Sequence, residues 1–324
     1  MAEAIVLREY GGPEVLRSES IEVGKPGPGE LRIRQTAVGI NFHDVYVRSG
    51  LYRTLSLPGI PGIEAAGVVE EVGPGVSGFA AGDRIAYVTA RYGTYTSERL
   101  LPADIAIRLP AAIDDKLAAT VLLKGLTAEM LVRQVYRIER GHLVLVHAAA
   151  GGVGRLLCQW ASHLGATVIG TVGSTEKAEI ARAAGCKHVV LYREENFVER
   201  VREITDGRGV DIVYDSVGRD TFEGSLDSLA TFGHLANFGQ SSGSVTAFEV
   251  ARLSKGSNAL SRPVVFHYVA DRAKLEGMST ALFDVLSRGA LTAQPGKAFP
   301  LAEAAAAHEE LESRRAAGPL LLVP

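Results

Sequence analysis

Two hydrophobic patterns divide the chain near residue 115. Before that point, short apolar runs lie between clusters of glycine and proline, which is typical of β-strands joined by turns. No segment with a helical period lies between these runs, so this part is predicted to be β-rich and not to follow a βαβ pattern. The predicted strands are Leu31–Val38, Ala66–Val72 and Arg84–Val88.

Beyond residue 115 the pattern changes to helices and strands in alternation. Asp115–Tyr136 is rich in alanine and leucine and is predicted to be a helix. The alternation after it predicts a parallel, doubly wound sheet. Its predicted elements are strand Leu143–His147, helix Gly152–Leu164, strand Thr167–Val172, helix Glu176–Ala184, strand His188–Leu191, helix Phe197–Thr205, strand Asp211–Tyr214, helix Thr221–Leu229 and strand His234–Phe238. Outside the alternation are helical runs Ala273–Arg288 and Leu301–Arg315 and the apolar end Leu320–Val323.

A loop of small residues joins the first strand and helix of this alternation. Its spacing is Ala149-x-Gly151-x-x-Gly154, the glycine fingerprint of dinucleotide-binding folds with alanine in the first place. Glycines there allow a tight turn and a close approach to phosphate, and the helix N-terminus presents N–H groups to the anion. The strand before the loop and the helix after it make a dinucleotide site the favoured interpretation.

Composition narrows the class of protein. The 324 residues suffice for two domains, and 47% of them are hydrophobic. A net charge of −3 argues against a nucleic-acid partner. The two cysteines, Cys158 and Cys186, form no metal-binding pattern. We see no signal peptide and no apolar run of about 20 residues that could span a bilayer, so we expect a cytoplasmic protein outside the membrane.

The end of the second predicted strand indicates which dinucleotide binds. A protein that prefers NAD usually has an acidic residue there for the ribose 2′-hydroxyl, whereas this chain has Gly173 and Ser174. Lys177 follows, and a cation beside a small residue suits a 2′-phosphate. We therefore predict NADPH rather than NADH, although Lys177 by position alone fits an ordinary solvated helix lysine equally well.

Several motifs along the whole chain resemble the zinc-independent quinone oxidoreductases of the medium-chain dehydrogenase/reductase superfamily, the group that includes zeta-crystallin. The match covers nearly all of the sequence, and the motifs occur in the order of the family. The matching motifs are Gly11–Leu16, Gly39–Asp44, Arg48–Tyr52, Lys124–Ala128, His147–Gly154, Tyr214–Gly218 and Ala307–Arg314.

The resemblance implies an α/β protein with two domains. A GroES-like, β-rich catalytic domain would contain residues 1–122 and 266–324, and a Rossmann NADPH-binding domain with a doubly wound parallel sheet would contain residues 123–265. It also implies a cofactor in the interdomain cleft and a homodimer.

Two positions depart from the zinc-dependent relatives. Asn41 stands where they have a cysteine ligand, and Ile63 stands where they have a histidine ligand. An amide and an alkyl side chain cannot replace thiolate and imidazole on zinc. The chain therefore resembles a metal-free enzyme.

The family's cofactor contacts can be carried over position by position. Gly152 and Val153 would hold the pyrophosphate, and Met130 stands where some members have an aromatic residue. The complete predicted set is Asn41, Phe42, Tyr46, Met130, Gly152, Val153, Gly173, Ser174, Lys177, Tyr192, Ser216, Phe238, Gly239, Gln240, Ser241, Pro263, Val264, Val265 and Arg314.

The predicted catalytic residues are hydrogen-bond donors. Without zinc, neutral groups must stabilise negative charge on the oxygen of the acceptor. The resemblance places Tyr46 and Tyr52 near the substrate, and Asn41 can donate through its amide. Packing tyrosines with surface hydroxyls are the alternative. We assign no role to His43.

Three functions stay open at this point. The first is transfer of hydride, or its one-electron equivalent, from NADPH to a quinone. The second is reduction of a 2-alkenal or enone, which is also a conjugated carbonyl. The third is a non-enzymatic, NADPH-binding structural or RNA-binding protein, and the mild acidity of the chain argues against RNA.

Overall fold

The computed structural model describes residues 1–313 and 318–324, and the chain divides into two compact units. The first unit contains Met1–Leu123, Val269–Phe283 and Ala293–Pro324. The second unit contains Lys124–Tyr268 and Asp284–Thr292. The short segment Asp284–Thr292, which the resemblance assigns to the catalytic domain, groups with the second unit, where Thr292 N donates to Gln159 Oε1 over 2.6 Å.

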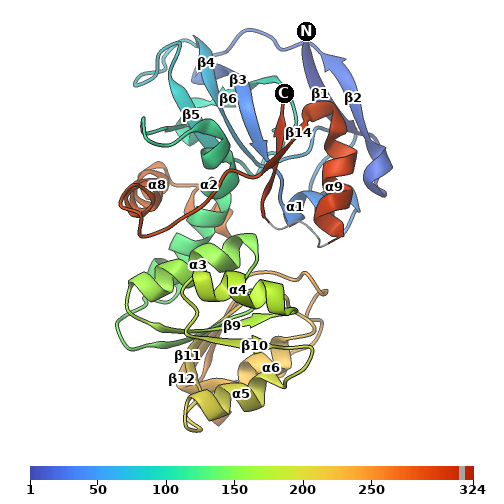
Figure 1. The fold of residues 1–324 in the computed structure, drawn as a ribbon. Helices are drawn as coiled ribbons and strands as arrows, with labels where there is room; N and C mark the ends of the chain where they lie inside the picture. The colour runs from blue at the N-terminus through green and yellow to red at the C-terminus, as the bar shows by residue number, and fades with distance from the viewer. Residues whose placement is uncertain (314–317) are drawn as a thin grey trace. The chain divides into compact units, whose positions relative to one another are not determined.

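The first unit is a β-structure with helices at its margins. Its main sheet has the order β14-β15-β3-β4-β5-β7, β6 also pairs with β3, and β1 pairs with β2 (Figure 1). The strands are β1 (Ala2–Leu7), β2 (Leu16–Ile21), β3 (Glu30–Gly39), β4 (Glu64–Val72), β5 (Arg84–Val88), β6 (Glu98–Pro102), β7 (Ile107–Arg108), β14 (Lys297–Pro300) and β15 (Leu320–Val323). The helices are α1 (Phe42–Arg48), most of α8 (Arg272–Ser287), α9 (Ala304–Glu312) and the start of α2 (Asp115–Glu129).

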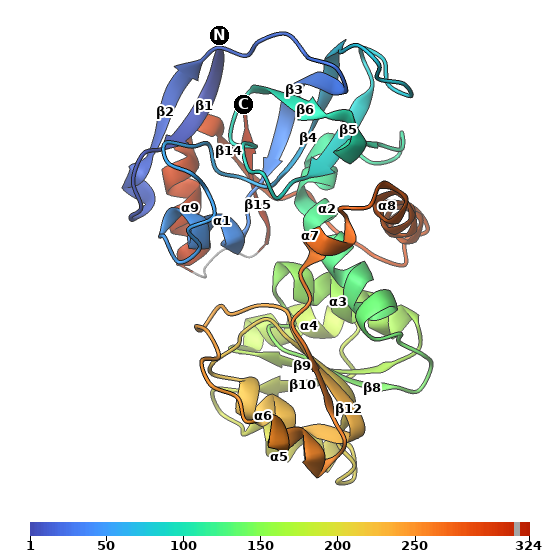
Figure 2. The same ribbon diagram turned by 180° about the vertical axis from the view of Figure 1, so that it is seen from behind.

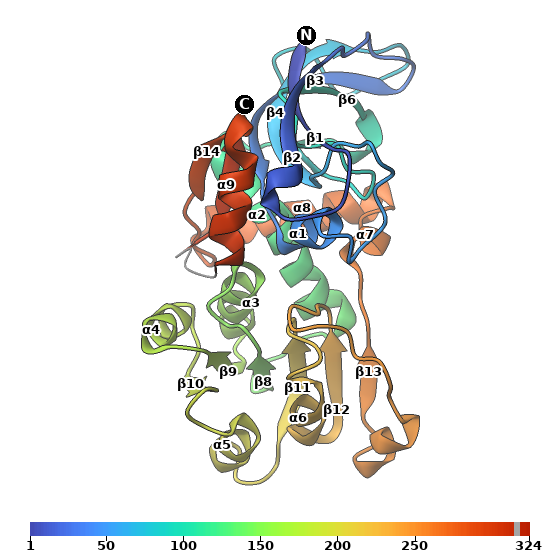
Figure 3. The same cartoon turned by 90° about the vertical axis from the view of Figure 1, so that its right-hand side faces the viewer.

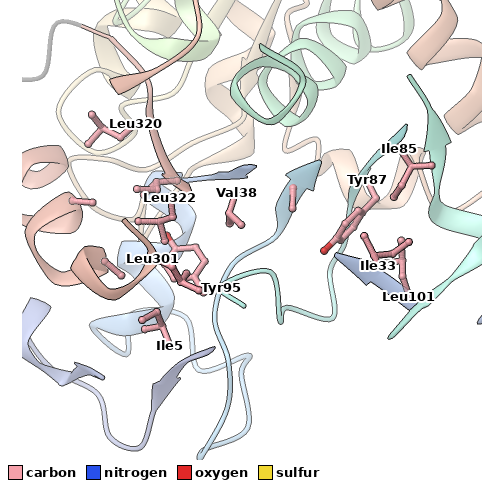
Figure 4. Packing of buried hydrophobic residues seen from close by; sticks show 14 of the residues in the cluster. Ile5, Ile33, Val38, Ile85, Tyr87, Tyr95, Leu101, Leu301, Leu320 and Leu322 are labelled. Carbon is pink, nitrogen blue, oxygen red and sulfur yellow. The ribbon is translucent and has the colours of Figure 1, made fainter. Parts of the chain in front are cut away.

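The C-terminal strand completes the first unit. β15 pairs antiparallel with the end of β3, with Leu322 opposite Val38, and Figure 2 shows the two strands side by side. Alternate residues of these strands point into one core. Figure 4 shows Tyr95 in the same packed group as Leu301 and Leu322, and all three are at most 1% exposed. The apolar end of the chain is therefore a core strand.

The second unit is a six-stranded, wholly parallel sheet. Its order is β10-β9-β8-β11-β12-β13, which is the doubly wound order 3-2-1-4-5-6 when the strands are numbered within the unit. Figure 3 shows β8, β9 and β10 between α3 and α4 on one face and α5 and α6 on the other. The strands are β8 (Leu143–Val146), β9 (Thr167–Val172), β10 (His188–Leu191), β11 (Val210–Asp215), β12 (Leu229–Asn237) and β13 (Ala259–Ser261). The helices are α3 (Gly152–His163), α4 (Thr175–Ala183), α5 (Phe197–Ile204), α6 (Phe222–Asp227) and α7 (Val265–Tyr268).

These two sheets confirm the predicted α/β fold class, and the structure corrects several boundaries. The helix predicted to Tyr136 is α2 to Glu129 followed by a π-helical turn, Met130–Val135. β12 begins at Leu229, five residues before the predicted start at His234. The run predicted from Leu301 is a 3-10 turn, Leu301–Glu303, followed by α9, and Arg315 lies outside the described residues.

Several elements were not predicted. They are short or lie beside turns, where the hydrophobic period gives little signal: β1, β2, α1, β6, β7, β13, α7 and β14. Within residues 1–313 and 318–324, no helix is both long and apolar enough to cross a membrane.

Candidate active site

The loop between β8 and α3 has the geometry of a phosphate cradle. Gly151 is the N-cap of α3 and has no side chain that could accept from the first N–H groups of the helix. Gly151 and Gly152 are exposed, and Val153 is half-buried. A Cβ on Gly154 would lie only 2.2 Å from the carbonyl oxygen of Ala148, so glycine is required where helix and loop touch. The exposed N-terminus of α3 therefore fits a pyrophosphate.

The next strand end gathers the residues predicted for the adenosine 2′-phosphate. Ser174 is the N-cap of α4, and its Oγ accepts from Lys177 N over 3.4 Å. A Cβ on Gly173 would lie 2.7 Å from the Tyr192 hydroxyl oxygen and 3.4 Å from Arg193 Nε. Arg193 is thus a second cation at this position that the sequence analysis missed, although it directly follows Tyr192.

The loops after β11 and β12 are bound to each other through their backbones. Phe238 N donates to Asp215 O over 2.8 Å, and Ser241 N donates to Ser216 O over 3.3 Å. A Cβ on Gly239 would lie 2.4 Å from Ser216 O. The structure thus brings together a further part of the predicted cofactor set: Ser216, Phe238, Gly239, Gln240 and Ser241.

The remaining predicted cofactor residues differ in exposure. Met130 is 1% exposed, so its side chain packs in the interior. Pro263 and Val265 are buried, and Val264 is exposed. Arg314 lies outside the described residues, 1–313 and 318–324.

In the first unit, α1 and the loop after it carry an aromatic cluster. The rings of Tyr46 and Tyr52 pack edge to face with centroids 5.2 Å apart, and Tyr52 N donates to Tyr46 O over 2.9 Å. Phe42, which is 39% exposed, lies 6.4 Å from Tyr46 between ring centroids. The two predicted catalytic tyrosines therefore share one face of this unit.

Sequence reasoning missed a second part of this cluster. His43 stacks on Tyr92 at 5.9 Å and lies 5.5 Å from Tyr52 between ring centroids. His43 Nε2 is 3.1 Å from the Tyr92 hydroxyl, which also bonds the Thr54 hydroxyl. Burial lowers the pKa of His43 to about 4, so the imidazole is neutral near pH 7. Tyr92 has a φ of 60°, but neither that conformation nor its partners could be read from Arg91-Tyr92-Gly93.

The positions that correspond to zinc ligands have other partners here. Asn41 Nδ2 donates to Glu64 Oε2 over 3.0 Å, and Leu123 N donates to Glu64 Oε1 over 2.6 Å. Glu64 is fully buried, and Ile63 beside it is 1% exposed. In the described residues, no group of three or more His, Cys, Asp or Glu side chains could hold a metal ion. An amide bound to a carboxylate and an alkyl group do not make a zinc site.

A buried chain of hydrogen bonds holds α1 in place. Arg48 NH1 donates to His308 Nδ1 over 3.2 Å, so the proton of the neutral imidazole lies on Nε2, 2.9 Å from the Tyr95 hydroxyl. Tyr95 donates to Asp44 Oδ2 over 3.3 Å, and that oxygen also accepts from Asn41 N over 2.8 Å. The hydrogen-bonded chain ends at the N-terminus of α1, where Asn41 is the N-cap of the helix that carries Tyr46.

The two middle members of this hydrogen-bonded chain, His308 and Tyr95, each favour one protonation state. Burial, assisted by the positive charge of Arg48, lowers the pKa of His308 to about 3. Burial and the neighbouring Asp44 raise the pKa of Tyr95 well above its usual value. Arg48, 2% exposed, also makes a two-pronged ion pair with Glu312 at 2.8 and 2.9 Å. The histidine and the tyrosine are therefore both neutral near pH 7.

Comparisons with known proteins agree with both units. Residues 27–111 match the alcohol dehydrogenase GroES-like domain, and residues 152–275 match the family described as zinc-binding dehydrogenase. A 2-haloacrylate reductase from a Burkholderia species is 45% identical and covers 100% of this chain and 99% of its own. A quinone oxidoreductase from Pseudomonas aeruginosa is 46% identical over the whole of both chains. The crystal structure of Escherichia coli quinone oxidoreductase complexed with NADPH is 45% identical and superposes with a TM-score of 0.96 over 100% of both chains.

Proposed function

The chain belongs to the quinone oxidoreductases of the medium-chain dehydrogenase/reductase superfamily, and we propose that it transfers a hydride from NADPH to a quinone without metal or flavin. The observation that carries this proposal is the carboxyl edge of the parallel sheet. There the bare N-terminus of α3 follows β8, and Gly173 and Ser174, with Tyr192 close to Gly173, follow the neighbouring strand β9, as a dinucleotide with a 2′-phosphate requires.

The residues of this chain bind NADPH and the quinone and polarise the oxygen of the quinone, because NADPH, when bound, supplies the hydride. Hydride arrival at a quinone leaves negative charge on an oxygen, and hydroxyl donors lower the energy of that charge. Tyr46 and Tyr52 carry such hydroxyls at the aromatic cluster, and Phe42 adds an exposed ring against which a planar acceptor can stack.

Replacing Tyr52 by phenylalanine tests this role. We expect kcat with a para-quinone to fall about 10- to 100-fold, while the Kd for NADPH stays within twofold, because only the hydroxyl that stabilises the reduced acceptor is lost. Tyr46→Phe is measured in parallel. Steady-state kinetics and fluorescence titration of NADPH give the two quantities. Unchanged kcat in both variants would remove the tyrosines from the mechanism.

Replacing Lys177 by alanine tests the 2′-phosphate site. We expect the Kd for NADPH to rise about 10- to 30-fold and the Kd for NADH to change less than twofold, because only NADPH carries the phosphate that the cation pairs with. Lys187→Ala removes an exposed lysine of the same unit as a control. Equal losses for both cofactors would refute the assignment.

A second candidate function is reduction of an activated alkene. It is favoured by the 2-haloacrylate reductase at 45% identity over the full chain. A conjugated carbonyl is common to quinones, enals and haloacrylates, so the same donors would serve each. Turnover with NADPH is therefore measured against ortho-quinones, para-quinones, enals and 2-haloacrylate. Turnover of alkenes without turnover of any quinone would favour the second function.

The homodimer stays a prediction from the resemblance. Light scattering of the full chain would measure it directly, with a mass of twice 34.3 kDa expected.

A further inference from the structure

A further buried histidine, His147, lies directly before the phosphate cradle, and neither cofactor binding nor the proposed chemistry accounts for it. His147 follows β8 and is 1% exposed. Its Nδ1 is 2.9 Å from Thr171 Oγ1 in β9, and its Nε2 is 3.0 Å from Ser225 Oγ in α6. Ser225 in turn donates to Asp215 Oδ2 over 3.1 Å at the end of β11. All four side chains are at most 2% exposed.

The direction of every bond in this chain follows from the carboxylate. An ionised Asp215 only accepts, so the Ser225 hydroxyl donates to it and must receive its own bond from His147 Nε2–H. His147 Nδ1 then carries the lone pair that accepts from Thr171. Burial lowers the pKa of His147, which agrees with a neutral ring in one tautomer. Thr171 therefore donates to His147, His147 donates to Ser225, and Ser225 donates to Asp215, which accepts at the end of the chain.

Asp215, at the end of this hydrogen-bonded network, accepts several hydrogen bonds at each carboxylate oxygen. Asp215 Oδ1 accepts from Val217 N over 2.8 Å and from Gly218 N over 3.0 Å, and Thr221 Oγ1 donates to both oxygens at 2.8 and 2.9 Å. The Ser225 hydroxyl is buried and committed to Asp215, so this serine, histidine and aspartate do not form a nucleophilic triad.

Three members of the hydrogen-bonded chain lie next to segments predicted to touch the cofactor, and the fourth, Ser225 in α6, links two of them. His147 precedes the α3 cradle, Thr171 precedes Gly173 and Ser174, and Asp215 precedes Ser216. Backbone bonds join the same elements, since Ala149 N donates to Thr171 O over 3.1 Å and His147 N donates to Tyr214 O over 3.0 Å. The side chains thus connect three neighbouring strand ends, β9, β8 and β11, on the edge where a dinucleotide would lie.

We propose that Thr171, His147, Ser225 and Asp215 form a positioning network that sets the spacing of the three cofactor-binding segments and so determines the affinity for the dinucleotide. None of the four needs to contact the cofactor. The network acts on the part of the site that NADPH and NADH share. Lys177, in contrast, is predicted to contact only the 2′-phosphate of NADPH. The inference rests on the proposed function, because it requires a dinucleotide at this edge.

The hydroxyl of Thr171 offers the cleanest test. Thr171→Val keeps the shape of the side chain but leaves His147 Nδ1 without its donor in the interior. We expect the Kd of the full-length protein to rise about tenfold for both NADPH and NADH, measured by fluorescence titration. Thr171→Ser restores the hydroxyl and should return both Kd values to within threefold of wild type. Ser225→Ala, which breaks the chain at its other end, should weaken both cofactors as Thr171→Val does.

A matched control lies in the same sheet. His234 in β12 bonds Ser261 Oγ over 2.7 Å through its Nε2, and His234→Leu breaks that pair away from the three strand ends. We expect it to leave both Kd values within twofold of wild type. Urea unfolding of every variant separates affinity from stability.

The possible outcomes distinguish the inference from the proposed function. If Thr171→Val and Ser225→Ala lower stability but bind both cofactors as wild type does, the network is merely structural and the inference is wrong. A loss for NADPH alone would also overturn it. If the wild-type protein binds neither cofactor, the proposed function itself fails.

Discussion

Replacing Gly154 by alanine is expected to weaken NADPH binding by more than 100-fold. The new Cβ would lie 2.2 Å from the carbonyl oxygen of Ala148 and 3.0 Å from the Cα of Ala149, both of them backbone atoms that cannot swing aside. Helix α3 and the cradle must therefore separate, which displaces the N–H groups that would bind the pyrophosphate. Overpacking of this kind costs about 3 kcal/mol of unfolding free energy as well. Fluorescence titration and urea unfolding measure the two effects.

Gly152 supplies the comparison for this prediction. A Cβ there would meet Lys124 Cδ at 3.1 Å, and a long flexible side chain can withdraw from such a contact. Gly152→Ala should therefore keep the stability of the wild type and lose affinity less severely than Gly154→Ala. The argument from the cradle would be wrong if Gly154→Ala bound NADPH as tightly as Gly152→Ala.

Acidification from pH 7.5 to pH 5 is expected to lower the free energy of unfolding by about 4 kcal/mol through two buried histidines. The folded-state pKa is about 3 for His308 and about 4 for His43, against 6.5 for the ordinary side chain. Both rings stay neutral in the folded protein at pH 5, whereas the unfolded chain binds a proton at each. Stability is therefore complete above pH 6.5 and falls as the pH drops toward the folded values, by about 2 kcal/mol per histidine at pH 5.

Single substitutions of histidine test which side chain causes this loss of unfolding free energy at low pH. The charged groups in the hydrogen-bonded chain of His308 are Arg48, its ion-pair partner Glu312, and Asp44. His43 contacts neutral groups, the Tyr92 hydroxyl and the ring of Tyr52. His43→Phe should reduce the difference between the unfolding free energies at pH 7.5 and at pH 5 by about 2 kcal/mol. His267→Gln, at an exposed position of α7, should leave it intact. An unchanged difference in His43→Phe would contradict the argument.

The elements that were predicted correctly from the sequence have a strong hydrophobic period and clear turn residues at their ends. The alternation that begins at Leu143 is confirmed almost element by element, because buried parallel strands are short apolar runs and the helices between them have one apolar face. The start of β12 was misplaced because Thr231 and Gly233 interrupt its apolar run, and Phe232 between them has a φ of 64°.

Partners of polar side chains were beyond the reach of the sequence. Arg48 bonds His308 across 260 positions, and His147 bonds Ser225 across 78. His43 was given no role, yet the structure places it between Tyr52 and Tyr92 in the cluster predicted to face the acceptor. A local sequence pattern does not indicate which distant element will pack against it, so such pairs could not be predicted.

The sequence by itself determined the parallel sheet and the glycine loop, and it predicted a 2′-phosphate site at Ser174 and Lys177. Through the family resemblance it also predicted the replacement of zinc ligands at Asn41 and Ile63. Each of these depends on residue types within a few positions of one another, where period, turn chemistry and ligand chemistry act. Only the tertiary structure decided how the site is held, through the chain from Arg48 to Asp44 and the chain from Thr171 to Asp215. The physical reason is burial: a polar group in the interior must find a partner wherever the strand order brings one.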